Sequence, residues 1–192
     1  MIYVPRLRSA ASGQPPRMWN WIGRLVEIAT RALSPGINDL FTAIAVVDRL
    51  GAVLETILAH RLNPRVLCDD AGAARVVANR SDHSGIFNAA FNSIRRAAAS
   101  HPEILIRIAD TLAKLAPLVD TPPARSAALI QLAKLTETTR LGTFTEADRV
   151  DTLARIEAAR VAISGPNRAR AAQTLHTLGK ARRTSPPALP SA

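Results

Sequence analysis

The chain has 192 residues, 47% of them hydrophobic and only 4% aromatic, which is enough for one domain with a core. Its formal net charge is +10, yet five arginines lie in residues 1–31 and five basic residues, with no acid, lie in 165–192. The middle is therefore nearly neutral, which disfavours a basic recognition surface on the folded domain itself, and the single cysteine, Cys68, excludes an internal disulfide.

The first residues predict a disordered basic arm over 1–18, because proline, glycine, serine and arginine dominate there. No apolar stretch resembling a signal peptide appears at this end. The longest nearly apolar run, Leu40–Val47, is far shorter than the about 20 residues that a membrane helix needs. We therefore expect a chain without a transmembrane segment.

A helical domain is predicted over 19–180, and its first two helices form an antiparallel hairpin. The first helix carries one apolar face. Ser34-Pro35-Gly36 ends it, with a positive φ expected at the glycine, and Asn38 or Asp39 caps the second helix, which runs to about His60. The residues expected to face inward are Trp19, Ile22, Val26, Ala29 and Leu33, then Phe41, Ile44, Val47, Leu50, Leu54, Ile57 and Leu58.

Residues 65–78 predict a short β-hairpin around a turn at 69–72, and we expect this hairpin to pack on the helices because a lone hairpin is marginal in water. Ser81 is predicted to cap a third helix, and Pro102 to begin a fourth. The expected inward residues are Ile86, Phe87, Ala90, Phe91 and Ile94, then Ile104, Leu105, Ile108, Leu112 and Leu115.

A fifth helix follows Thr121-Pro122-Pro123, with Leu129, Leu132 and Leu135 on its apolar face. Thr145 and Asp148 resemble a capping box for the next helix. That helix places Val150, Leu153, Ile156 and Ile163 inward, and Gly165-Pro166 precedes a last amphipathic segment with Leu175 and Leu178. The tail 181–192 is predicted to be disordered. The fold class is thus mainly α, a single domain of about six to seven helices with one hairpin.

The run from Gly23 to Asp39, with the sequence SPGIND at 34–39, resembles the signature of a bacterial family of predicted membrane proteins, domain of unknown function 2254. Weaker similarity extends from about Trp21 to Arg160. Leu40 stands where the family usually has proline. The resemblance implies several N-terminal membrane helices, a small β-rich segment and a helical soluble domain, of which this chain matches only the last. We therefore expect either a truncated gene product or a membrane half that lies elsewhere.

Two polar clusters are candidates for a binding site. Free N–H groups where the second helix begins could hold an anion, although the carboxylate of Asp39 would repel one. Asn88, Asn92 and Arg95 share one stripe of the third helix. They could face the same loop as a polar pocket, lock the helix against that loop by hydrogen bonds, or form a solvated flank. The candidate residues are Ser34, Gly36, Asn38, Asp39, Thr42, Asn92 and Arg95.

Catalytic chemistry has little support in the sequence. The four histidines lack the spacing of metal ligands, and no glycine-rich phosphate loop or nucleophile elbow is present. We therefore expect no catalytic residues, no metal and no cofactor.

The function that the sequence favours is a non-catalytic interaction or regulatory domain on the cytoplasmic side of a membrane-protein family. It would contact an anionic membrane surface through the basic residues of 6–31, or form a homo-oligomer through the Trp19–Leu33 face. One alternative is a small-ligand or anion-binding domain that uses the Ser34–Thr42 loop. Another is a nucleic-acid-binding protein that uses the basic ends, which lack interleaved aromatic residues.

Overall fold

The computed structural model describes residues 17–60, 66–69, 72–77 and 82–165, and these form six helices and one β-hairpin. The mainly α fold that the sequence predicted is therefore confirmed. Residues 1–16 of the expected arm, the segment with Leu175 and Leu178, and the tail 181–192 lie outside the described residues. The helices are α1 (Arg17–Ala32), α2 (Leu40–Ala59), α3 (His83–Ala97), α4 (Pro102–Lys114), α5 (Pro122–Leu141) and α6 (Glu146–Ser164).

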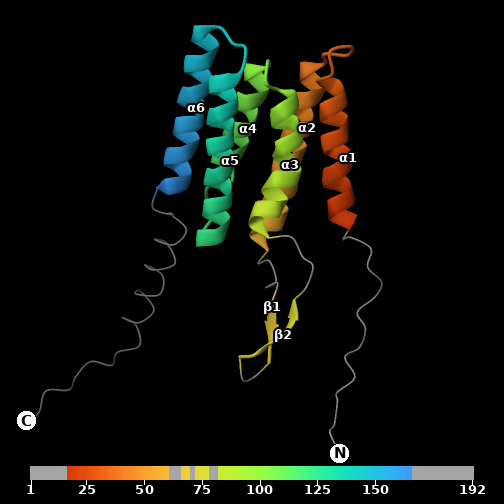
Figure 1. The fold of residues 1–192 in the computed structure, drawn as a ribbon, viewed down its shortest axis with the longest axis vertical. Coiled ribbons are helices and arrows are strands. Elements are labelled where there is room, and N and C mark those ends of the chain that lie inside the picture. Colours follow the sequence, from red (N-terminus) through yellow and green to blue (C-terminus); the bar gives the residue numbers. More distant parts are fainter. Residues whose placement is uncertain (1–16, 61–65, 70–71, 78–81, 166–192) are drawn as a thin grey trace, which may run out of the picture.

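The helices form an array of two layers, which Figure 1 shows from the side. In one layer α3 lies between α1 and α5, and in the other α4 lies between α2 and α6. Successive helices run in opposite directions, so α1, α3 and α5 point one way and α2, α4 and α6 the other. As a result, α1 and α2 stand at one edge of the array, and α5 and α6 stand at the opposite edge.

One contiguous core lies between the two layers. Phe87 and Phe91 of α3 are almost fully buried, with ring centroids 6.4 Å apart. The predicted inward residues of α3 and α4 are all buried, as the i, i+3, i+4 spacing requires. Two predictions are wrong: Phe41 of α2 is 88% exposed and Val150 of α6 is 56% exposed, because both lie opposite the face that their helix buries.

Short side chains fix where the helices begin. Asp39, Thr121 and Thr145 each accept a hydrogen bond from the backbone N–H three residues later, and α4 and α5 both begin at a proline. The cap of α3 is Asp82 rather than Ser81, because the Asp82 carboxylate accepts from the Gly85 N–H at 2.7 Å. Thr145 and Asp148 depart from a full capping box, since the Asp148 carboxylate accepts from the Thr145 hydroxyl instead of the backbone.

The hairpin pairs β1 (Val66–Cys68) with β2 (Ala74–Val77) in an antiparallel register that shifts between Leu67 and Cys68. Its turn depends on Asp69, whose carboxylate accepts from the Ala73 N–H and pairs with Arg75, and on Gly72 at φ +80°. The prediction that it packs on the helices is wrong, because the hairpin projects beyond the end of the array (Figure 1). The described part of α1 begins at this same end.

Candidate functional site

The corner between α1 and α2 is held by hydrogen bonds between its own backbone groups. The N–H groups of Ile37 and Asn38 donate to the carbonyl of Ser34, and that of Asp39 donates to the carbonyl of Ala32 at 2.8 Å. The positive φ is 47° at Asn38, so the prediction that Gly36 would adopt it is wrong. Asparagine tolerates this left-handed conformation better than most side chains do.

Both oxygens of the Asp39 carboxylate already accept hydrogen bonds from the first turn of α2, the helix that Asp39 caps. One oxygen accepts from the Thr42 N–H at 3.0 Å, and the other accepts from the Thr42 hydroxyl. Thr42 and its hydrogen bonds hold the pKa of Asp39 below its ordinary value, so the group is anionic at neutral pH. An incoming anion would meet this negative charge where the N–H groups of α2 begin, which disfavours the anion-binding interpretation of the loop.

The lowered pKa of Asp39 predicts a specific acid dependence of stability. Because the folded pKa lies below the unfolded value of about 3.9, the stabilisation is complete above about pH 4 and is lost as the pH falls through the folded pKa. An asparagine at this position would also cap the helix but would not titrate, so Asp39→Asn should unfold less steeply with acid than the parent chain. Chemical denaturation between about pH 2 and 6 measures this difference, and parallel curves for the two chains would contradict it.

Asn88, Asn92 and Arg95 face α5 rather than the corner, so the predicted cluster with the Ser34–Thr42 loop does not form. The Asn88 side-chain oxygen accepts from Gln131 and Lys134 of α5, both at 2.7 Å, and from Asn92 at 3.2 Å. Lys134 also donates to the Asn92 oxygen at 3.4 Å. The polar stripe of α3 thus lies against a polar stripe of α5.

Arg95 extends this contact toward the end of the two helices. Its guanidinium donates to the Thr138 hydroxyl, while its Nε is buried without a partner. Burial, followed by the charge of Arg96, lowers the pKa of Arg95, and Glu137 opposes that shift. The group stays a cation, because arginine does not deprotonate in proteins.

We call this set of contacts the α3–α5 ladder. It is rich in hydrogen-bond donors, and several of them share one acceptor, the side-chain oxygen of Asn88. Its members are Asn88, Asn92, Arg95, Gln131, Lys134 and Thr138. Its chemistry is that of a lock between two helices, because its side chains hydrogen-bond one another, with the buried Nε of Arg95 as an exception. Gln131, Lys134 and Thr138 were missed in the sequence reasoning. Their positions i, i+3 and i+7 place them on one side of α5, which is the signal that could have identified them.

Asp48 pairs with Arg107 at 2.9 Å and so joins α2 to α4. Both side chains are more than a third exposed, so this pair contributes little to stability. Within the described residues, no group of three His, Cys, Asp or Glu side chains is placed to bind a metal ion. No described helix combines the length and the apolar character that crossing a membrane requires.

Two exposed apolar regions lie at opposite edges of the array. On α1, Trp21 is 63% exposed and Ile28 is 48% exposed. Between α5 and α6 an open groove of about 780 Å³ has an apolar floor and a charged rim. On the Trp19–Leu33 face, which was one candidate for self-association, Ile22, Ala29 and Leu33 are buried against the neighbouring helices, and the side chain of Trp19 lies outside the described residues.

Comparison with known proteins confirms the resemblance seen in the motif. Residues 21–114 match the family described as "Predicted membrane protein (DUF2254)". Uncharacterized proteins of Mycobacterium tuberculosis and Mycobacterium bovis are 33% identical over 127 residues. This match covers 66% of the present chain but only 24% of each relative. No solved structure matches the chain.

Proposed function

We propose that this chain is a non-catalytic interaction or regulatory module that works at the cytoplasmic face of a membrane, with α1 as the edge that meets the bilayer. The family match to predicted membrane proteins supports the membrane context. The observation that carries the proposal is the exposed side of α1, where apolar and cationic side chains lie together.

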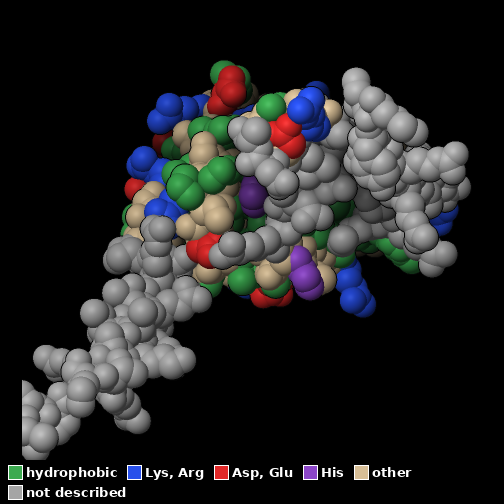
Figure 2. Space-filling view, turned by 90° about the horizontal axis from the view of Figure 1, so that it is seen from below, with side chains coloured by type: hydrophobic (Ala, Val, Ile, Leu, Met, Phe, Trp, Pro, Cys, Tyr) green, Lys and Arg blue, Asp and Glu red, His purple; other side chains and the backbone are tan. Residues whose placement is uncertain are grey.

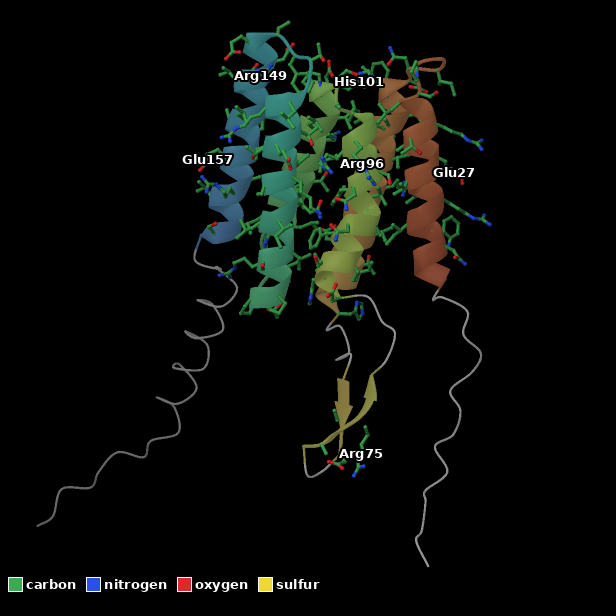
Figure 3. All side chains as sticks on the ribbon, in the orientation of Figure 1. Glu27, Arg75, Arg96, His101, Arg149 and Glu157 are labelled. Atoms are coloured by element: carbon green, nitrogen blue, oxygen red, sulfur yellow. The ribbon has the colours of Figure 1, made fainter. Side chains whose placement is uncertain are left out.

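Trp21 and Ile28 are seven residues apart, so they share one side of α1. The exposed residues Arg24 and Arg31 lie beside them, and Glu27, which pairs with Arg31 at 3.1 Å, points away from the array in Figure 3. Tryptophan and arginine both combine an apolar body with a polar end, which suits the boundary between headgroups and acyl chains. The sequence adds Arg6, Arg8 and Arg17 on the N-terminal side.

Two other parts of the described surface carry mixed charge, unlike the α1 edge. Figure 2 looks onto the end of the array from which the hairpin projects, and basic and acidic side chains are interspersed over its described part. At the opposite edge α6 carries three basic and four acidic side chains, whereas α1 carries three arginines and one glutamate. The α1 edge therefore combines exposed tryptophan, exposed isoleucine and an excess of arginine.

Flotation of the full chain with vesicles of phosphatidylserine and phosphatidylcholine tests this proposal. Each cation near an anionic surface is worth about 1 kcal/mol, so Arg24→Glu with Arg31→Glu should lower binding on the order of 30-fold or more at low salt. The matched control, Arg155→Glu with Arg160→Glu, makes the same change of charge at the far edge of the array and should reduce binding much less.

The salt dependence of binding distinguishes an electrostatic contact with the lipid surface from non-specific adsorption to the vesicles. Binding of the parent chain should fall steeply between about 50 mM and 500 mM salt, because added ions screen the lipid surface. Absence of flotation at low salt, or an equal loss in both charge-reversed pairs, would contradict the proposal.

A further inference from the structure

Exposed apolar side chains gather at the two opposite edges of the array. Within the described residues, the large hydrophobic side chains that remain exposed come either from α1, α2 and the corner between them, or from α5 and α6. They are Trp21, Ile28, Ile37 and Phe41 at the first edge, and Ile130, Leu141, Val150 and Val161 at the second. Exposed apolar side chains that are grouped in this way often mark contact sites, so we expect the α5–α6 edge to have a partner of its own.

The α5–α6 edge carries both a hollow and a protruding side chain. The hollow is the open groove, whose floor is formed by the half-buried Leu129 and Leu153 above the buried Leu132 and Ile156. The protruding side chain is Leu141, the last residue of α5, which lines the groove and is 80% exposed. A patch with both features fits a second copy of itself, because a two-fold contact places each feature opposite its complement.

The charges around the groove also suit a second copy. Its rim carries Glu137 and Arg140 from α5 and Glu157 and Arg160 from α6, all of them exposed. Glu157 lies at the outer edge of α6 in Figure 3. Two acids and two bases make this rim neutral, although the whole chain has a formal charge of +10. A strongly charged partner gains little from such a rim, whereas two identical copies meet without net repulsion and with both signs present for pairing.

We propose that two copies of this chain form a two-fold symmetric dimer through the α5–α6 groove, with Leu141 of each copy seated in the groove of the other. A head-to-tail contact between the α5–α6 edge of one copy and the α1–α2 edge of the next would instead build a ring or an open filament. The two-fold contact closes after two copies and leaves both α1 edges free. This dimer goes beyond the proposed function and shares no residue with the α1 edge.

Sedimentation velocity of the full chain without lipid, at about 1–200 µM, tests the dimer, and the parent chain should pass from monomer to dimer over this range. Leu141→Arg should weaken the dimer at least about tenfold, because the contact would bury a charge in an apolar groove. Phe41→Arg is the matched control, since Phe41 is 88% exposed at the opposite edge and undergoes the same change from apolar to cationic. It should leave the dimer intact.

Two single charge reversals test whether the two rims face each other. Each reversal changes the neutral rim by two units, to +2 in Glu157→Arg and to −2 in Arg140→Glu. Each variant alone should dimerise at least about tenfold more weakly at low salt, because rims of like charge repel each other. An equimolar mixture of the two variants should form mixed dimers, because their rims are then of opposite sign.

The side chains changed in these variants are exposed in the single chain, and circular dichroism checks that each variant stays helical. A parent chain that stays monomeric up to about 200 µM would overturn the proposal and leave the groove to a different occupant. A dimer that survives Leu141→Arg would also overturn it. So would an equal loss in Leu141→Arg and Phe41→Arg together with species larger than dimers, which would indicate the head-to-tail contact.

Discussion

Replacing Asn88 with alanine is expected to lower the free energy of unfolding by about 1–3 kcal/mol, because several donors would lose their shared acceptor. Gln131 is only 1% exposed and donates to the Asn88 oxygen, so its amide would be buried without a partner. Lys134 would keep only the longer contact to Asn92. Urea denaturation at neutral pH measures the change.

Two further variants separate the hydrogen bonds of Asn88 from its packing. Asn88→Asp keeps the acceptor and adds a charge beside Lys134, so it should retain most of the stability that alanine loses. Asn88→Leu combined with Gln131→Leu removes donor and acceptor together, and should cost less than the sum of the single changes. Strict additivity, or an Asn88→Ala chain as stable as the parent, would contradict the proposed lock.

Gly142→Ala is expected to destabilise the chain by about 1–3 kcal/mol through overpacking. A Cβ at this position would lie 2.5 Å from the carbonyl oxygen of Ala99 and 2.7 Å from the ring of Phe144. The φ of Gly142 is −71°, so the glycine is required for close approach and not for a left-handed backbone. Arg149 holds the same corner by donating to the carbonyls of Thr139 and Arg140, both at 2.8 Å, which leaves little freedom to shift.

Gly36→Ala is the matched control in the other corner. A Cβ there would have no neighbour within 4 Å, and Gly36 does not adopt a positive φ. The substitution restricts the unfolded chain without a clash, so it should be neutral or stabilising by about 0.4–1 kcal/mol. A clear loss of stability in Gly36→Ala, or none in Gly142→Ala, by thermal unfolding would contradict this assignment of roles.

The helices could be predicted from the sequence because local signals decide where they begin and end. Pro102, Thr121 and Asp39 fix helix starts through their own backbone and side-chain chemistry, without help from distant residues. Apolar spacing then identified the buried faces of α3 and α4. The motif at 34–39 led to the correct family match.

The two wrong inward residues share one cause. Phe41 and Val47, like Val150 and Ile156, are six positions apart, and six residues turn a helix by about 600°, leaving the two side chains on different faces. Both residues were predicted to face inward because they are hydrophobic, although the helical period places them outside the buried face. Neither residue is needed in the core, because Ala43 and Thr152 are buried on the correct faces instead.

The candidate site was harder to predict because it depends on pairing between distant helices. Nothing in the local sequence specifies that Asn88 meets Gln131 and Lys134, which lie more than forty positions away along the chain. The layer order decides this contact, since α3 packs on α5. The same holds for the α5–α6 groove, which only the stacking of helices creates.

The fluorescence of the two tryptophans tests the central proposal most directly, because both belong to α1 and the chain has no others. Titration with vesicles containing phosphatidylserine should shift the emission maximum to shorter wavelength, as Trp21 leaves water for the bilayer boundary. Vesicles of phosphatidylcholine alone, or about 500 mM salt, should largely abolish the shift. An emission maximum that stays unchanged with excess anionic vesicles at low salt would contradict α1 as the membrane-facing edge.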